Sequence, residues 1–255
     1  MIRGLRSKQI WINDRWQSAD LLFDEHGLIE AIKDYKSAEI DLIDHGALSV
    51  IPGLVDTHVH FNEPGREDWE GVSSGTAAAA AGGITTVVDM PLNSSPVTTT
   101  PETVGAKIAA VESKLSIDFA MHGGLVPENC DKMDALIQSG VLGIKAFLCP
   151  SGIDEFGHVG RKELEIAMPA IAASGLPLLV HAEVVHEVEV TSDPRNHGDY
   201  AATRPPSFER NAIEMMIELV EQTGCKVHIV HLADAGSIPA LAAARGEGLP
   251  ITVET

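Results

Sequence analysis

Apolar stretches recur along the chain with a regular rhythm from residue 48 onward. A short, β-branched apolar run is followed by a loop, a helical stretch, a Gly, and then the next run. Gly directly after a helical stretch is typical of a helix end. Strands that alternate with helices predict parallel βα units with right-handed crossovers. We count seven such strands, beginning at Leu48, Ile84, Ile117, Val141, Leu176, Lys226 and Ile251.

This rhythm predicts an α/β barrel. A (β/α)8 barrel of the TIM type typically needs ~250 residues, and the chain has 255. Because the count stops at seven strands, we expect residues 49–255 to form a barrel that ends before its eighth strand.

Residues 1–48 follow a different pattern. The short runs Lys8–Ile12 and Ala19–Phe23 read as strands, and Asp24–Gly27 reads as a hairpin turn. Short hairpins need a partner layer to form a stable core. We therefore expect this segment to be the N-terminal part of a small β-sandwich domain.

Composition narrows the class of protein. Hydrophobic residues make up 44% and aromatic residues only 4% of the chain, which suits parallel strands packed beneath helices. A formal net charge of -19 repels phosphate backbones and anionic lipids, so we expect neither nucleic acid nor membrane partners. The three widely spaced Cys predict no disulfide framework and favour a reducing, cytoplasmic location. The N-terminus lacks a signal-peptide pattern, and no apolar run is long enough to span a bilayer.

Two histidines close the first apolar run. His58 and His60 follow Leu48–Val55, which reads as a short buried strand. Side chains alternate along a strand, so both imidazoles project from one face, as half of a metal site would. The alternative is that two of the 11 histidines simply fall close together.

Further strand ends carry chemistry at the rim where barrel enzymes place their active groups. Lys145, His181 and His231 stand at or near the ends of three later strands. A single buried His is more often a hydrogen-bonded core residue, but three strands that each end in His favour a shared metal site. His228, three residues before His231, cannot face the same way; it faces the helices or supports a ligand from behind.

Lys145 lies in an apolar strand, where burial of an ammonium is costly and lowers its pKa. A neutral amine can react with CO₂ to give a carbamate, which is a carboxylate-like ligand able to bridge two cations. The alternative is a rim lysine whose stem snorkels to solvent.

Five segments together resemble the cyclic amidohydrolases, a family that includes dihydroorotase, dihydropyrimidinase and allantoinase. The segments are Asp56–Gly65, Gly82–Thr86, Met90–Asn93, Gly143–Phe147 and Leu179–Glu183. The resemblance covers essentially the whole chain and implies a metal-dependent barrel with a small β-sheet domain.

The resemblance also implies a binuclear centre of two divalent ions, most readily zinc, with iron, cobalt, nickel or manganese as alternatives. The implied ligands are His58, His60, carboxylated Lys145, His181 and His231. An Asp that is both ligand and general base would follow an eighth strand, beyond residue 255. A homo-oligomer, a tetramer in the family, is implied as well.

The substrate class follows from one position. Dihydroorotase-like sequences place an Arg where this chain has Asn62, and Asn cannot replace an Arg–carboxylate pair. A neutral cyclic amide is therefore the expected substrate. Arg66 is the nearest rival anion partner, unless it is a loop arginine paired with Glu67 or Asp68.

Within the family, the motifs Met90–Asn93, Arg66–Gly71 and Cys149–Gly152 resemble those of allantoinases most. The implied activity is hydrolysis of allantoin to allantoate. Asn93 would contact a ring amide through its donor and acceptor, unless it is only a turn residue. Asn62 is the second expected substrate contact. Glu183 and Asp89 would orient ligands, unless they are plain loop carboxylates.

Two other interpretations stay open. A dihydropyrimidinase or hydantoinase, or a dihydroorotase, would also open a cyclic amide ring. A metal-free scaffold protein of the same fold is the non-enzyme alternative, which the presence of all five expected ligands within this span disfavours.

Overall fold

The structure is a computed structural model that describes residues 3–38, 40–188, 193 and 195–255. It divides into two compact units, Met1–Leu54 and Val55–Thr255. The division falls a few residues after the expected boundary at residue 48. Each unit is described by itself.

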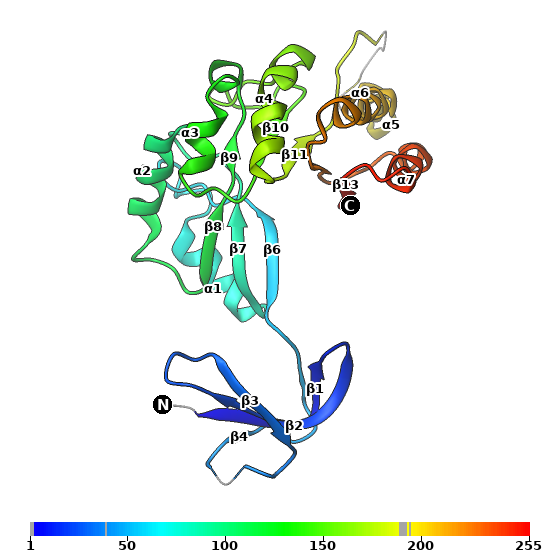
Figure 1. Cartoon of the computed structure of the whole chain (residues 1–255). Coiled ribbons are helices and arrows are strands. Elements are labelled where there is room, and N and C mark those ends of the chain that lie inside the picture. Colours follow the sequence, from blue (N-terminus) through cyan, green and yellow to red (C-terminus); the bar gives the residue numbers. More distant parts are fainter. Residues whose placement is uncertain (1–2, 39, 189–192, 194) are drawn as a thin grey trace. The chain divides into compact units, whose positions relative to one another are not determined.

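The smaller unit is a five-stranded sheet (Figure 1). Three of its strands are antiparallel in the order β3-β2-β1, and two short strands pair in parallel with β1. The strands are β1 Gly4–Ile12, β2 Arg15–Phe23, β3 Ile29–Asp34, β4 Ile43–Asp44 and β5 Ser49–Val50. The expected turn after Phe23 is present, since Asp24 Oδ1 accepts the N–H groups of His26 and Leu28.

The expectation of one buried strand over Leu48–Val55 is wrong. Ser49–Val50 belong to the smaller sheet, and the first strand of the larger unit is β6, Leu54–Val59. Pro52 has no N–H to donate, and Pro52-Gly53 separates the two strands. Leu48 and Val55 are 67% and 60% exposed. The histidine pair nevertheless stands at a strand end, with His58 inside β6 and His60 just beyond it.

Two sheets form the strands of the larger unit. One has the order β6-β7-β8, and the other has the order β13-β12-β11-β10-β9 and is parallel throughout. After β6, the strands are β7 Ile84–Asp89, β8 Asp118–Met121, β9 Gly123–Gly124, β10 Ile144–Phe147, β11 Leu178–His181, β12 Val227–Ile229 and β13 Ile251–Val253. Strand neighbours in space are also neighbours in sequence, as a βα barrel requires.

Helices alternate with these strands as the rhythm predicts. They are α1 Val72–Ala81, α2 Pro101–Val111, α3 Met133–Gln138, α4 Arg161–Ser174, α5 His197–Ala202, α6 Ser207–Thr223 and α7 Ile238–Gly246, with 3-10 turns at Pro127–Asn129 and Ala235–Ser237. Thr100 caps α2 by accepting the N–H of Thr103. Gly175 and Gly224 end α4 and α6 with φ of 76° and 66°, a left-handed conformation that favours Gly.

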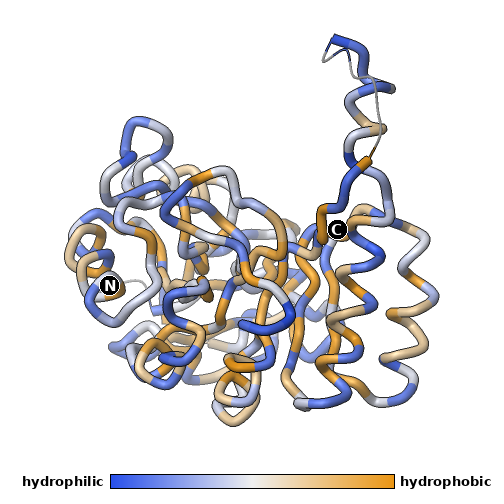
Figure 2. Tube along the Cα trace, turned by 90° about the horizontal axis from the view of Figure 1, so that it is seen from above, coloured by the Kyte–Doolittle hydropathy of each residue, from blue (hydrophilic) through white to orange (hydrophobic). Residues whose placement is uncertain are grey.

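The main core lies between the strands β10–β12 and the helices packed on them. Leu164 and Met168 of α4, and Met216 and Leu219 of α6, are buried with Ile144 and Leu178. In Figure 2, hydrophobic (orange) and hydrophilic (blue) positions alternate along the helical coils. This packing fixes the strand ends, where the expected site residues lie.

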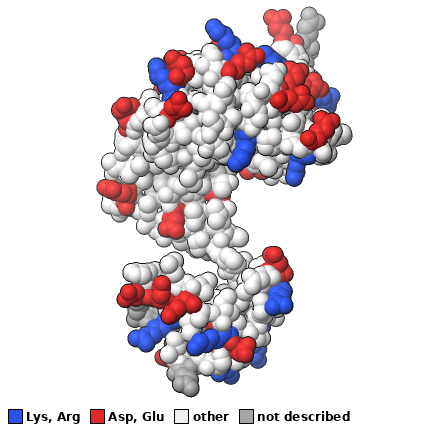
Figure 3. Space-filling view, viewed as in Figure 1, with Lys and Arg blue, Asp and Glu red and all other residues white. Residues whose placement is uncertain are grey.

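The surface agrees with the acidic composition. In Figure 3, Asp and Glu side chains are more prominent than Lys and Arg among the charged groups on the visible face of the larger unit. In the described part of the chain, none of the helices combines the length and the apolar character that a membrane span requires.

Candidate metal centre

Four imidazoles from separate parts of the larger unit meet at the strand ends. The ring centroids of His58 and His60 are 5.5 Å apart, those of His58 and His231 are 5.8 Å apart, and those of His181 and His231 are 4.6 Å apart. His181 Nδ1 lies 3.1 Å from His231 Nε2. The structure thus brings together all four histidines that the sequence placed at this rim.

Two of the rings are held by their Nδ1 atoms. His60 Nδ1 lies 3.1 Å from the carbonyl oxygen of Leu92, and His58 Nδ1 contacts a carboxylate oxygen of Glu254. An N–H that donates to an oxygen fixes the tautomer and leaves Nε2 with its lone pair. This is the arrangement that second-layer oxygens give to metal-binding histidines.

His231 takes its place through an uncommon backbone conformation. Its φ is 42°, in the left-handed region that L residues with a Cβ rarely adopt. The turn comes two residues after β12 ends at Ile229. Such strained positions cluster at functional sites, and here the turn places the imidazole beside His181 and His58.

Lys145 is the most unusual group at the rim. Lys145 is 1% exposed, and its Nζ has no hydrogen-bond partner within the described part of the protein. Nζ lies 4.9 Å from the ring centroid of Phe147, which stacks on His181 at 4.6 Å. Burial lowers the pKa of Lys145 to about 7. The alternative that its stem snorkels to solvent is therefore wrong.

Burial also keeps the neighbouring imidazoles neutral. It lowers the pKa of His60 and of His231, and it lowers the pKa of His181 to about 3 with help from nearby His231. A metal ligand must offer a lone pair rather than a proton. These three imidazoles therefore present neutral nitrogen donors at neutral pH.

Glu254 is a site residue that the sequence reasoning missed. It follows β13 directly, contacts His58, and its Oε2 lies 3.4 Å from His228 Nε2. His228 Nδ1 in turn lies 2.8 Å from Thr252 Oγ1. His228 thus supports the site from behind rather than facing the helices. The position of Glu254, directly after a predicted strand, was the available signal.

Asp89 is a buried structural carboxylate rather than a loop residue. It forms an ion pair with Lys107, and the two side chains are 0% and 1% exposed. Asp89 Oδ1 accepts the N–H of Phe61 at 2.7 Å, and Lys107 Nζ donates to the carbonyl oxygen of Phe61 at 3.2 Å. The pair therefore holds both backbone groups of the residue that follows His60.

The two asparagines expected to contact substrate lie together. Asn93 Nδ2 donates to Asn62 Oδ1 at 3.2 Å, and Asn62 is buried. Arg66 donates to the carbonyl oxygen of Asn93 and, at 2.8 Å, to Glu155 Oε1. The alternative that Arg66 pairs with Glu67 or Asp68 is therefore wrong, because its guanidinium forms an ion pair with Glu155.

A second group of possible ligands lies beside His181. Cys149, His181 and Glu183 each offer one ligand atom, and these atoms all lie within 4.8 Å of one another. Burial raises the pKa of the Cys149 thiol to about 11, with a contribution from Glu183. Glu183 Oε1 lies 3.6 Å from His181 Nε2.

His122 gives the fold a pH dependence. Burial lowers its pKa to about 4, and its Nε2 lies 3.2 Å from the carbonyl oxygen of Thr57. The unfolded chain takes up a proton near pH 6.5, while the folded chain keeps this imidazole neutral until about pH 4. The contribution of His122 to stability is therefore full above pH 6.5, and about 3 kcal/mol is lost as the pH falls from 6.5 to about 4.

We expect His122→Gln to make the loss between pH 7.5 and pH 5 smaller by about 2 kcal/mol, while His60, His181 and His231, whose pKa burial also lowers, keep their share of it. The measurement is the free energy of urea unfolding of the metal-free protein at pH 7.5 and pH 5. The matched control is His197→Gln at an exposed position of α5, which should keep the wild-type slope. An unchanged slope in His122→Gln would show that this imidazole does not set the dependence.

Comparison with known proteins identifies the family of the chain. The sequence profile of the Amidohydrolase family matches residues 49–250. The chain belongs to the amidohydrolase family. The predicted resemblance is thereby confirmed over most of the larger unit.

Two curated relatives of this amidohydrolase chain are named as allantoinases. The chain is 43% identical to an allantoinase of Arabidopsis thaliana over 86% of the chain and 46% of the relative. It is 44% identical to an allantoinase of Streptomyces avermitilis over 84% of the chain and 48% of the relative. The chain thus spans about half the length of these relatives.

Solved structures give the fold. An L-hydantoinase (dihydropyrimidinase) from Arthrobacter aurescens superposes with a TM-score of 0.85 at 27% identity, covering 98% of this chain and 57% of that one. The expected fold class, a TIM-type α/β barrel of the amidohydrolases with a small β-sheet domain, is confirmed. The seven predicted strands correspond to β6–β8 and β10–β13, and the two-residue β9 follows β8 after one residue. A further barrel strand after these seven stays a prediction.

Proposed function

We propose that the protein hydrolyses the cyclic amide bond of allantoin to give allantoate, with two divalent metal ions held at the strand-end rim. The observation that carries the proposal is the buried amine of Lys145, which has no hydrogen-bond partner among the described residues and lies beside four clustered imidazoles. The choice of substrate rests on the identity to curated allantoinases.

The residues of the rim fit a binuclear centre. His58, His60, His181 and His231 offer imidazole nitrogens, a donor type that suits zinc, iron, cobalt, nickel and manganese. A buried amine with no partner is costly as an ammonium, and as a carbamate Lys145 would become an anionic bridging ligand. When bound, two such ions supply Lewis acidity and a water of lowered pKa.

The chain's own residues orient this donor set. Glu254 and the carbonyl oxygen of Leu92 hold the tautomers of His58 and His60. Asp89 and Lys107 hold the backbone next to His60. Asn62 and Asn93 would present amide donors and acceptors to the ring. The resemblance implies an Asp as the general base, and this role stays a prediction.

The geometry favours a neutral ring over dihydroorotate. Asn62 stands where dihydroorotase-like sequences place a carboxylate-binding Arg. Arg66 already donates to Glu155 and to the carbonyl oxygen of Asn93. A substrate carboxylate would therefore lack a bidentate guanidinium partner.

The test is a substrate panel on the intact, metal-loaded protein. We expect kcat/KM for allantoin to exceed that for hydantoin, dihydrouracil and dihydroorotate by more than about tenfold, a difference of about 1.4 kcal/mol in transition-state binding. A higher value for hydantoin or dihydrouracil would assign the hydantoinase alternative. No stoichiometric metal and no turnover would assign the scaffold alternative. The cytoplasmic location and the tetramer stay predictions.

A further inference from the structure

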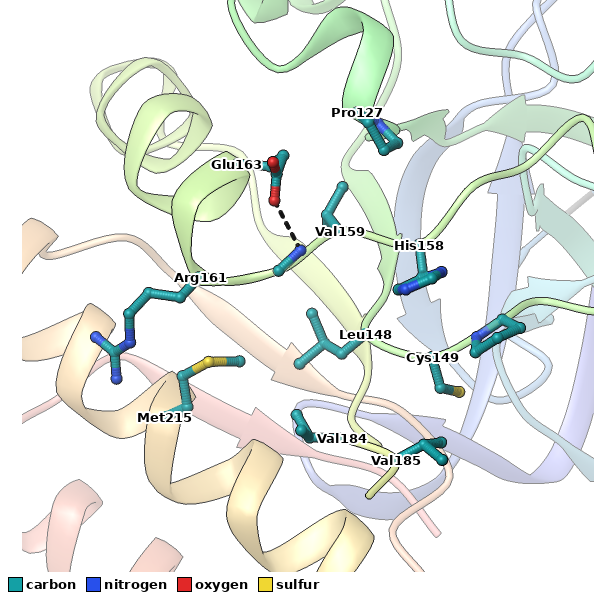
Figure 4. A pocket seen from close by; sticks show the side chains of 12 residues that line it. Pro127, Leu148, Cys149, His158, Val159, Arg161, Glu163, Val184, Val185 and Met215 are labelled. Carbon is teal, nitrogen blue, oxygen red and sulfur yellow. Dashed lines mark hydrogen bonds between the residues drawn. The ribbon is translucent and has the colours of Figure 1, made fainter. Parts of the chain in front are cut away.

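Cys149 stands between two pockets at the ends of β10 and β11. One pocket, of about 400 Å³, is shown in Figure 4, with Cys149 next to Leu148 and His158 at its edge. The other, of about 520 Å³, is lined by Cys149 together with His181 and Glu183. A small solute in the second pocket therefore meets a thiol, an imidazole and a carboxylate.

These three groups form a compact donor set. Their ligand atoms lie within 4.8 Å of one another. Ligand atoms of a tetrahedral zinc site, with bonds of ~2.0–2.3 Å, lie about 3.5 Å apart. Small side-chain rotations would therefore close the set around one ion, and the pocket would leave a fourth position open.

Charge and ligand softness both suit a soft dication. A thiolate and a carboxylate would neutralise two positive charges, while neutral His181 adds none. When the ion binds, the S–H bond of Cys149 breaks, the S–metal bond forms, and the proton leaves to solvent. Sulfur and imidazole donors select zinc, cadmium or cobalt rather than magnesium or calcium.

His181 connects this set to the centre proposed above. Its Nδ1 faces His231 at 3.1 Å, and its Nε2 faces Glu183 at 3.6 Å. A neutral imidazole has one lone pair and one N–H. It can therefore ligate a cation on one side at a time.

We propose that Cys149, His181 and Glu183 form an additional, inhibitory site for a soft dication, which competes with the metal centre for His181. The inhibition rests on the proposed function, whereas binding to Cys149 does not. Excess zinc or cadmium would then inhibit the protein by withdrawing one ligand from the centre.

The test titrates cadmium chloride into the intact, metal-loaded protein. Two signals are followed, the ultraviolet charge-transfer absorbance of a cadmium–thiolate bond and the rate of allantoin hydrolysis. In the wild type, the absorbance should saturate near one cadmium per chain while the rate falls in parallel. In Cys149→Ser the band should be absent, and half-inhibition should need at least about tenfold more cadmium, a tenfold change in apparent affinity.

Two further variants sharpen the test. Cys225→Ser changes another buried, free thiol and should behave as the wild type. Glu183→Gln should keep the band but weaken cadmium binding. Each rate is compared with the same variant's cadmium-free rate, and Cys149→Ala serves if the Ser variant fails to fold.

A band that survives in Cys149→Ser, or a wild type without a band, would overturn the site. A band without parallel inhibition would overturn the competition for His181. If the protein does not hydrolyse allantoin, the proposed function fails, but the absorbance still decides the site.

Discussion

Lys145→Ala should lose both bound metal and hydrolytic activity. Lys145 is buried in β10, and its Nζ has no protein partner in the described structure. If the amine is a carbamate in the active protein, its loss removes an anionic ligand that both ions share. We expect the metal content to fall from two ions per chain and kcat/KM to fall by more than the ~10–100-fold typical of outer-shell partners.

A short carboxylic acid such as acetate or propionate should restore part of the activity of Lys145→Ala, because the carboxylate can occupy the vacated space. The matched control is Lys162→Ala, which changes an exposed lysine of α4 and should keep both metal and activity. Full activity in Lys145→Ala would refute the bridging role. Lost activity with unchanged metal content would do the same.

Lys107→Met should destabilise the fold by about 3–5 kcal/mol, because it leaves the fully buried carboxylate of Asp89 without its cation. The free energy of urea unfolding of the metal-free protein measures this. The double variant Lys107→Met/Asp89→Asn should be more stable than Lys107→Met alone. It removes the unpaired charge, and an Asn oxygen can still accept the N–H of Phe61.

The same pair should matter for metal affinity. It holds the backbone of Phe61, the residue after His60, so the double variant should bind metal about 10–100-fold more weakly. The contrasting pair is Arg161–Glu218, whose side chains are 40% and 58% exposed; Arg161→Met should cost at most about 1 kcal/mol. If the variants of the buried pair and of the exposed pair lost the same metal affinity, the buried pair would have no role in positioning His60.

Most elements of the fold could be predicted from local sequence patterns. The helix that begins after Thr100 and the Gly stops at Gly175 and Gly224 follow from capping and backbone rules that act over a few residues. Alternation within strands placed His58 and His60 together. Strand ends share one rim in a βα barrel, so Lys145, His181 and His231 could be added without knowledge of their contacts.

Long-range pairings could not be predicted in the same way. Nothing near Lys107 in sequence indicates that its ammonium is buried against Asp89 and Phe61. The contact between Glu254 and His58 joins residues that are 196 positions apart in the sequence. The prediction of one buried strand over Leu48–Val55 failed because its apolar residues suggested burial, whereas Pro52 lies between strands that belong to two different sheets.

The most direct test of the central claim is metal-dependent opening of allantoin by the purified intact protein. Allantoate formation is measured before chelation, after removal of the metal, and after zinc and bicarbonate are restored. We predict turnover that disappears with the metal and returns only when zinc and bicarbonate are supplied together, with two ions per chain. Turnover that survives removal of the metal, or a fully loaded protein that leaves allantoin intact, would contradict the account.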